Sequence, residues 1–264
     1  MMVILTGGTG FIGSFLREEL LGRGHEVVVP TRRGVSIPGV KTVRVSGEPE
    51  EYGRLVGELN PDVVINLIGV LKGDYHKAHA EIPREIAKAC SSCRLIQMSA
   101  LGADEDSVVP YFKTKALGEK EAKKAESYAI VRPSLVLGPG QRLFRDALKW
   151  RVFPKLKTPV QPIDVRDLVK IIADLLERDE NLEVNLCGEE IVPLGQLVRE
   201  VVSLAGKRIL LFPVPESFLR FAGKLNPAVL MALKPNICER NDALSFLELT
   251  PLEESIRWTA EGLR

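Results

Sequence analysis

The sequence predicts an α/β fold in which a doubly wound parallel sheet precedes a small, irregular C-terminal lobe. Short apolar runs alternate with helical patterns through the first half of the chain, as in sheets covered by helices on both faces. After about residue 140 the prolines multiply and the alternation loosens. We therefore expect a sheet domain over residues 1–140 and a smaller, mostly helical lobe over residues 141–264, partly interwoven with the sheet.

Periodicity and turn residues predict each element in turn. We expect strands at residues 2–5, 27–29, 40–45, 63–69, 95–98 and 128–131, and helices at 11–20, 52–59, 76–89 and 111–125. Gly22 and Gly24 end the first helix, and Asn60-Pro61-Asp62 ends the second. The proline-rich lobe suits a position over the carboxyl edge of the sheet, where ligands bind in open α/β folds.

Composition excludes several classes of protein. The 264 residues are 45% hydrophobic and 27% charged, and the net charge of +1 gives no overall field to hold nucleic acid. No apolar run reaches the ~18 residues that a transmembrane helix needs. Because the first strand begins at Met2, we expect no secretory signal or transit peptide and a cytoplasmic protein.

The cysteines and histidines predict no metal site and no disulfide framework. Four cysteines are few for a chain of this length, and Cys90 and Cys93 form the one CxxC pair. A redox pair favours the start of a helix, where the thiol pKa falls, whereas this pair follows a predicted helix. We interpret it as a helix-to-strand connection, with a redox or metal role as the alternative.

The glycines that follow the first strand indicate a nucleotide site. Gly8, Gly10 and Gly13 satisfy the dinucleotide fingerprint, and Gly7 adds the variant with glycines at 7, 10 and 13. Such glycines permit a tight turn and a close approach of backbone to pyrophosphate. The following helix then presents free N–H groups to the phosphates. The alternative is a purely structural turn.

The end of the second strand indicates which dinucleotide is bound. NAD-selective sites place an acidic residue about 20 residues after the glycines, whereas this chain has Pro30-Thr31-Arg32-Arg33. A guanidinium matches a phosphate in a bidentate geometry. We therefore predict NADP(H) rather than NAD(H), with Arg32 as the first candidate for the 2′-phosphate and Arg33 as the second. A solvated basic turn is the alternative.

A second constellation carries acid–base chemistry. Tyr111 and Lys115 are four residues apart on a predicted helix, so they lie on one face. A neighbouring ammonium stabilises a phenolate, so we expect a lowered Tyr111 pKa. Ser99 follows directly on a predicted strand, where its hydroxyl can hold a substrate oxygen.

These segments together resemble the extended and atypical short-chain dehydrogenase/reductases, which have the Rossmann fold. Residues 6–13 match the nucleotide loop, residues 66–69 the loop beside the adenine-side ribose, and Ser99, Tyr111 and Lys115 the catalytic trio. Residues 131–139 are similar to the strand and loop that line the nicotinamide pocket, and residues 161–167 to a later P-hydrophobic-x-V-x-D stretch.

The chain resembles one subgroup of this family, the relatives of the nucleotide-binding accessory subunit of respiratory complex I. The resemblance lies in residues 99–103, 111–119 and the tail around 225–258. Two features depart from the family. Val45-Ser46-Gly47 lacks the aspartate common near the adenine, and only 12 positions separate Ser99 from Tyr111, which is short for a sugar-nucleotide epimerase.

The resemblance implies a full set of site residues. The catalytic residues are Ser99, Tyr111 and Lys115. The cofactor-binding residues are Gly7, Thr9, Gly10, Phe11, Ile12, Gly13, Arg32, Arg33, Leu67, Ile68, Gly69, Met98, Ser99, Tyr111, Lys115, Pro133, Ser134 and Val136.

We accordingly expect an NADP(H)-dependent oxidoreductase acting on a small carbonyl or hydroxyl compound. The alternatives are a non-catalytic NADPH-binding structural, assembly or sensor protein and, behind it, a nucleotide-sugar epimerase or dehydratase. Apolar residues within 208–235 form either the core of the smaller lobe, which we favour, or an apolar pocket or partner surface. A protein partner and a homodimer, usual in the wider family, stay open.

Overall fold

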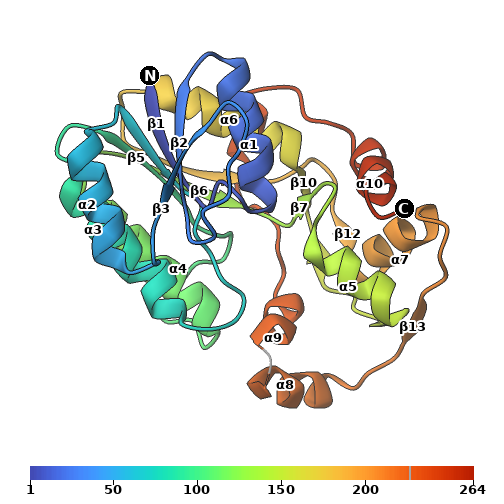
Figure 1. Cartoon of the computed structure of the whole chain (residues 1–264). Helices are drawn as coiled ribbons and strands as arrows, with labels where there is room; N and C mark the ends of the chain where they lie inside the picture. The colour runs from blue at the N-terminus through green and yellow to red at the C-terminus, as the bar shows by residue number, and fades with distance from the viewer. Residues whose placement is uncertain (226) are drawn as a thin grey trace. The chain divides into compact units, whose positions relative to one another are not determined.

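The computed structural model describes residues 1–225 and 227–264 and shows an α/β fold around a twisted sheet (Figure 1). Within these residues seven strands form the sheet, in the order β11-β6-β5-β4-β1-β2-β3. They are β1 (Met2–Thr6), β2 (Glu26–Thr31), β3 (Lys41–Arg44), β4 (Val63–Asn66), β5 (Arg94–Met98), β6 (Ser127–Pro133) and β11 (Leu182–Leu186). The pairings that join β3 through to β6 are parallel, so the carboxyl ends of these strands meet at one edge. The predicted doubly wound parallel sheet is confirmed.

Helices cover both faces of this sheet. The helices are α1 (Phe11–Gly22), α2 (Pro49–Leu59), α3 (Ile82–Ala89), α4 (Pro110–Ala122) and α6 (Val165–Asp174). Figure 1 shows α2, α3 and α4 side by side on one face, where Ile4, Val64 and Ile86 contribute to a buried core. On the other face Arg23 of α1 forms an ion pair with Asp174 of α6, at 2.6 Å.

The helix predicted over residues 76–89 is in fact two elements. A π-helical segment, η1 (Lys77–Glu81), precedes α3. Because Pro83 has no N–H, it leaves the His79 carbonyl without the usual helical donor four residues later. Gly118 of α4 packs against that carbonyl so closely that a Cβ there would lie 1.9 Å from the oxygen.

The chain divides into two compact units, residues 1–132 with 169–184 and residues 133–168 with 185–264. The described part of the second unit contains three two-stranded sheets and the helices α5, α7, α8, α9 and α10. The paired strands are β7 (Val136–Leu137) with β10 (Ile163–Asp164), β9 (Pro159–Val160) with β12 (Val192–Pro193), and β8 (Val152–Pro154) with β13 (Leu210–Phe212). The helices are α5 (Arg142–Trp150), α7 (Leu194–Leu204), α8 (Glu216–Leu225), α9 (Pro227–Leu233) and α10 (Leu252–Glu261). Short 3₁₀ turns, η2 (Leu175–Glu177) and η3 (Asp242–Ser245), complete the elements.

The second unit has a hydrophobic core of its own. Phe144 of α5, Val201 of α7 and Ile256 of α10 are buried together in it. The family-like tail expected around residues 225–258 includes Asn226, which lies outside the described residues.

The expectation that the cysteines form no disulfide framework is wrong. Cys90 is bonded to Cys93, and Cys187 to Cys238. The second pair is 51 residues apart, and no sequence spacing indicates it. Asn241, three residues after Cys238, also joins the two segments: it hydrogen-bonds the backbone N–H and carbonyl of Cys187, at 3.1 and 3.0 Å. The CxxC pair lies between a helix and a strand as expected, because Cys90 follows α3 and Arg94 begins β5.

Candidate active site

The glycine loop joins β1 to α1 and is too tightly packed for side chains. A Cβ on Gly13 would lie 2.3 Å from the Gly7 carbonyl oxygen, and Gly7 itself has a φ of +74°. The Gly10 N–H donates to the Gly7 carbonyl at 2.9 Å, which closes the turn. Gly10 caps α1 with no side-chain acceptor, and the first turn of the helix has no acidic residue. The loop therefore leaves the helix N-terminus open to an anion.

A buried polar ladder fixes the strand ends beside this loop. The Thr6 hydroxyl donates to Asn66 Oδ1 at 2.6 Å, and Asn66 Nδ2 donates to Gln97 Oε1 at 2.8 Å. The same Asn66 oxygen accepts from the Ile68 N–H at 3.2 Å. These bonds join β1, β4 and β5 side chain to side chain and set the course of the loop over residues 67–70.

That loop carries the predicted residues Leu67, Ile68 and Gly69. The Leu67 N–H donates to the Thr6 carbonyl at 3.1 Å, and the Leu67 carbonyl lies against Gly7. Leu67 and Ile68 are half-buried and Gly69 is exposed. In the glycine loop, Thr9 is exposed, whereas Phe11 and Ile12 are half-buried at the start of α1.

Ser99 directly follows β5, and its hydroxyl is the unusual group of the site. The side chain is buried, yet Oγ has no hydrogen-bond partner among the described residues. A buried unpaired hydroxyl costs about 1–3 kcal/mol of stability. The backbone holds it in place, since the Ser99 N–H donates to the Val131 carbonyl at 2.7 Å.

Lys115 reaches the end of β5, at the residue before Ser99. Its ammonium donates to the carbonyl of Met98 at 3.0 Å, and a Cβ on Gly69 would lie 3.4 Å from Nζ. Burial lowers the Lys115 pKa to about 8, although Glu119 on the same helix opposes the shift. Ser99, Lys115 and the loop after β4 are thus brought together by the strand ends and α4.

Tyr111 is one turn before Lys115 on α4, but the expected lowering of its pKa is wrong for this structure. Burial raises the Tyr111 pKa to about 12, with a smaller contribution from Tyr75. The ring packs edge-on against His79 and Tyr75, with centroids 5.3 and 6.4 Å away. The Lys115 ammonium donates to Met98 instead, so desolvation of the phenol decides the direction of the shift.

His79 is a site residue that the sequence reasoning missed. It is fully buried, and burial followed by the charge of Lys115 lowers its pKa to about 3. Its Nε2 accepts from the Val70 N–H at 3.0 Å, so the proton is on Nδ1, 2.9 Å from Thr114 Oγ1. Thr114 can accept there because its own hydroxyl donates to the Pro110 carbonyl at 2.8 Å. No sequence motif marks this residue; its position depends on η1.

Arg32 and Arg33 follow β2 as exposed side chains. The described residues give neither guanidinium an ion-pair partner. Arg32 extends over Gly47, where a Cβ would lie 2.9 Å from its Cδ, and the φ of Gly47 is +101°. A glycine at position 47, in the segment that lacks the family's aspartate, therefore makes room for the arginine.

The remaining predicted residues, Pro133, Ser134 and Val136, belong to the second unit. The buried Ser134 hydroxyl donates to the Gln161 carbonyl at 2.6 Å, and Val136 pairs with Ile163. Pro133 ends β6. Ser134 is thus already paired, in contrast to Ser99.

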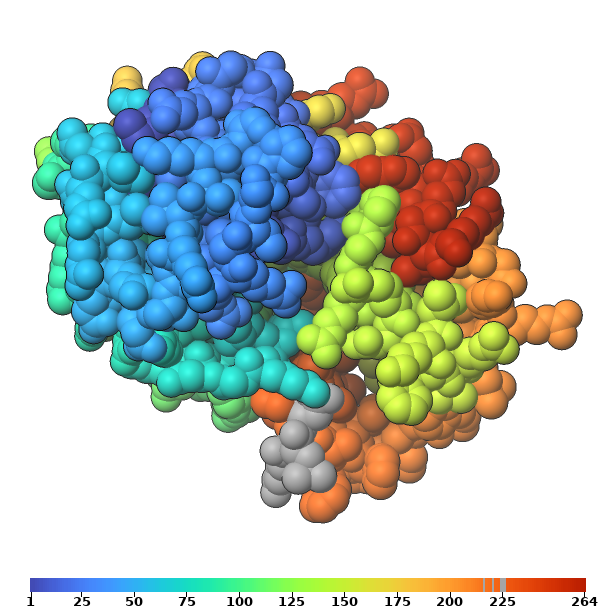
Figure 2. Space-filling model, in the orientation of Figure 1, coloured from blue at the N-terminus to red at the C-terminus, as the bar shows by residue number. Residues whose placement is uncertain are grey.

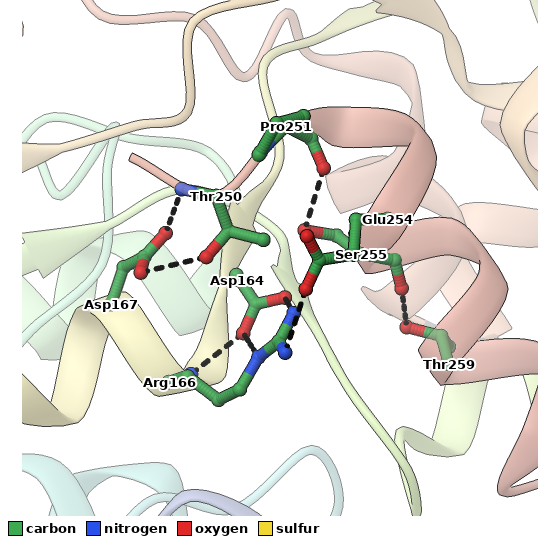
Figure 3. Close-up of polar contacts among 8 residues, drawn as sticks. All are labelled: Asp164, Arg166, Asp167, Thr250, Pro251, Glu254, Ser255 and Thr259. Atoms are coloured by element: carbon green, nitrogen blue, oxygen red, sulfur yellow. Dashed lines mark hydrogen bonds and ion pairs between the residues drawn. The ribbon is translucent and has the colours of Figure 1, made fainter. Parts of the chain in front are cut away.

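The motif over residues 161–167 is tied to the start of α10 (Figure 3). Asp167 accepts from the Thr250 N–H at 2.7 Å and from its hydroxyl at 2.9 Å. The Arg166 guanidinium bridges the buried Asp164 and Glu254, both at 2.9 Å. These hydrogen-bonded carboxylates organise the second unit.

The first unit fits a dinucleotide on two structural grounds. The Gly7–Gly13 turn is a cradle that a Cβ would fill, and the buried Ser99 hydroxyl lacks a partner in the described chain. In contrast, no group of three or more metal-ligating side chains is found among the described residues.

Comparison with known proteins gives one family match. The model of the NAD dependent epimerase/dehydratase family matches residues 3–187. The rat mitochondrial NADH dehydrogenase [ubiquinone] 1 alpha subcomplex subunit 9 is 27% identical over 250 residues, which cover 83% of this chain and 65% of that protein. The ceramide reductase of Caulobacter vibrioides is 30% identical over 192 residues, which cover 65% of this chain and 60% of the reductase. The chain therefore spans less than two thirds of the length of these relatives.

Solved structures show the same fold. The Bordetella bronchiseptica enzyme WbmH in complex with NAD+ superposes on this chain with a TM-score of 0.77 at 17% sequence identity. The match covers 99% of this chain and 97% of the WbmH chain. A human epimerase family protein with NADPH gives a TM-score of 0.75 at 20% identity and covers 99% of both chains. Both nicotinamide dinucleotides thus occur in similar folds.

Proposed function

Because the chain belongs to the NAD dependent epimerase/dehydratase family, we propose that it is an NADP(H)-dependent oxidoreductase of the short-chain dehydrogenase/reductase type. Its substrate is a small carbonyl or hydroxyl compound. The observation that carries this proposal is the buried, unpaired Ser99 hydroxyl at the carboxyl end of β5. A stability cost of this kind is typical of a site arranged for a ligand.

Each polar group has a role in this proposal. Ser99 Oγ donates to the substrate oxygen and orients it, and Tyr111 gives or takes the proton at that oxygen. Lys115 holds positive charge beside them and binds the nicotinamide ribose. His79 keeps the loop after β4 and helix α4 in register. When bound, the nicotinamide supplies or accepts the hydride.

Arg32 supports the choice of NADP(H). It lies at the end of β2, over Gly47, with no acidic partner among the described residues. A 2′-phosphate would supply the anion that this guanidinium lacks.

The reductases among the relatives support an apolar carbonyl as substrate. One relative is named a ceramide reductase and another, from Stenotrophomonas maltophilia, a 2-alkyl-3-oxoalkanoate reductase. We propose a substrate with a carbonyl beside an alkyl chain.

The test is NADPH oxidation followed with a panel of alkyl ketones and β-keto acids, for the wild type and for Tyr111→Phe. We expect turnover to fall at least 100-fold in Tyr111→Phe, because a general acid contributes 10²–10⁴-fold. Tyr75→Phe is the matched control, since Tyr75 lies in the same aromatic cluster and its hydroxyl donates to the Leu71 carbonyl. Turnover unchanged in Tyr111→Phe would contradict the proposed role.

One observation favours a second candidate function, a non-catalytic NADPH-binding protein that stabilises an assembly or senses the cofactor. The Tyr111 pKa is raised to about 12, and Lys115 donates to a backbone carbonyl instead of to the phenol. A site that only binds the cofactor needs no ionised phenol. NADPH binding that raises the midpoint of thermal unfolding, with no turnover of any carbonyl in the panel, would favour this candidate.

The proposal extends to where the protein is located in the cell and to what it binds. None of the described helices combines the length and apolar character that crossing a bilayer requires. We propose a cytoplasmic protein with a small-molecule substrate and no nucleic-acid partner, whereas the rat relative is named as mitochondrial. Cell fractionation and pull-down with NADPH present test the location and any protein partner or homodimer.

A further inference from the structure

The β8–β13 ribbon of the second unit has an apolar outer face. In its parallel register Leu210 is opposite Val152 and Phe212 is opposite Pro154, so these residues share one side of the ribbon. Val152, Leu210 and Phe212 are exposed there, while Phe153, on the other side, packs on the core. Exposed apolar patches on a protein surface mark interaction sites when they are extensive.

Three further aromatic residues are exposed close in sequence to this ribbon. Trp150 ends α5 just before β8, and Phe218 and Phe221 are three residues apart on α8. Trp150, Phe218 and Phe221 are 68%, 62% and 61% exposed, whereas Leu219 between the two phenylalanines is buried in the core. The favoured interpretation of residues 208–235 as core is thus correct for Leu219 and wrong for Leu210, Phe212, Phe218 and Phe221.

Basic residues adjoin Trp150 and β13 along the chain. Residues 142–157 contain six Lys and Arg against one Asp, although the whole chain has a net charge of only +1. Lys149 and Arg151 flank Trp150, and Lys207 and Arg208 precede β13, all of them exposed. The Lys149 ammonium lies 5.5 Å from the centre of the Trp150 ring. Within the described chain none of these four cations forms an ion pair with a carboxylate.

We propose that this aromatic-basic surface, comprising Trp150, Val152, Leu210, Phe212, Phe218 and Phe221 with their flanking cations, docks on an anionic lipid bilayer. Exposed Trp and Phe insert at the level of the headgroups, and Lys and Arg bind anionic lipids from the rim. Figure 2 shows the lime surface of α5 adjoining the orange surface of the later segments of the same unit.

A bilayer fits this surface better than a protein partner. The cores of protein interfaces are depleted in Lys, whereas here Lys149 adjoins Trp150 and Lys207 precedes β13. Lysine and arginine stems lie along apolar surface while their charged ends reach the headgroups, which suits a lipid interface. The proposal does not depend on the proposed oxidoreductase activity, because the site residues of the first unit play no part in it.

Sedimentation of the full chain with vesicles tests the proposal. We expect it to pellet at low salt with vesicles of phosphatidylcholine mixed with phosphatidylglycerol, but not with phosphatidylcholine alone, and to be released at high salt. Lys149→Glu with Arg151→Glu should weaken binding at least about five-fold per cation, the equivalent of about 1 kcal/mol for each. Phe218→Ser with Phe221→Ser should remove it. The matched controls are Val108→Ser, which is 86% exposed in the first unit, and Lys41→Glu.

Tryptophan emission gives a second readout, because the chain has only two tryptophans. Anionic vesicles should shift the emission of the wild type and of Trp258→Phe to the blue, and this shift should be absent in Trp150→Phe. Three results would overturn the proposal: no pelleting with anionic vesicles at low salt, equal pelleting of the wild type and the surface variants, or a dimer without vesicles that Phe218→Ser with Phe221→Ser converts to monomer. The last result would make a second copy of the chain the occupant.

Discussion

His79 accepts a hydrogen bond at Nε2 from the backbone N–H of Val70, 3.0 Å away. Through Nδ1 the same ring reaches Thr114, one residue before Lys115. A single neutral imidazole therefore connects the loop after β4 to the helix that carries Tyr111 and Lys115. Protonation at Nε2 would replace an acceptor with a donor that faces the Val70 N–H.

The pH dependence of stability should report this ring. The His79 pKa is about 3 in the folded chain and about 6.5 when unfolded, so between these values the unfolded chain binds a proton that the folded chain does not. His79 therefore lowers stability as the pH falls from about 6.5 towards 3, by up to about 1.4 kcal/mol per pH unit. Chemical unfolding at several pH values in this window measures the slope.

His79→Phe cannot titrate, so its free energy of unfolding should fall less steeply across this window than that of the wild type. His76→Asn, at an exposed position in the same segment, is the control and should keep the wild-type slope. Equal slopes in all three proteins would show that His79 is not held neutral.

Ser99→Ala should separate stability from activity. Removing a buried hydroxyl that has no partner in the described chain should leave the free energy of unfolding unchanged or raise it by about 1 kcal/mol. Turnover with the best substrate should fall at least ten-fold. Ser134→Ala is the matched control, because its buried hydroxyl donates to Gln161 and its loss should cost about 1 kcal/mol. A Ser99→Ala protein less stable than Ser134→Ala would show that the hydroxyl is paired.

Two glycines of α1 should respond oppositely to alanine. A Cβ on Gly13 meets the Gly7 carbonyl oxygen at 2.3 Å, so Gly13→Ala should displace the loop and destabilise the protein by about 1–3 kcal/mol. A Cβ on Gly22 meets nothing within 4 Å, and Gly22→Ala should stabilise the helix by about 0.5–1 kcal/mol. Thermal unfolding and NADPH titration of both variants measure the contrast. A Gly13→Ala protein that keeps wild-type affinity would contradict the packing described for the loop.

The Cys187–Cys238 disulfide should stabilise the second unit. Closing a loop of 51 residues lowers the entropy of the unfolded chain by the equivalent of about 4 kcal/mol in the chain-entropy model, and a loop of three residues by much less. Reduction should therefore lower the unfolding midpoint of the wild type but not that of Cys187→Ser with Cys238→Ser. Alkylation followed by mass spectrometry gives the thiol count directly, and four reactive thiols before reduction would rule the bonds out.

Much of the fold could be predicted because its determinants are local. The glycine turn, the apolar strand runs and the stop at Asn60-Pro61-Asp62 each act within a few residues, and β1, α1 and β4 begin where expected. The π-helical η1 was not predicted: Pro83 removes a helical donor locally, but the packing of Gly118 against the His79 carbonyl joins distant segments and has no sequence signal.

In the candidate site, too, some features are indicated by local sequence and others are set only by the tertiary fold. Residue types and spacing indicated Ser99, Tyr111 and Lys115, but their protonation depends on burial and on which acceptor the ammonium reaches. The Lys115 ammonium donates to the Met98 carbonyl rather than to the Tyr111 phenol, and desolvation raises the Tyr111 pKa. His79 and the Cys187–Cys238 bond lacked a sequence signal because their partners are brought close only by the tertiary fold.

The central claim is tested most directly by calorimetric titration of the wild type and Arg32→Glu with NADPH and with NADH. We predict that the wild type binds NADPH at least ten-fold more tightly than NADH and that Arg32→Glu removes this preference, because a charged hydrogen bond to phosphate contributes about 1.5–3 kcal/mol. Arg54→Glu, at an exposed position on α2, should behave as the wild type does. NADH binding as tight as that of NADPH, or an Arg32→Glu protein that keeps its NADPH affinity, would contradict the account.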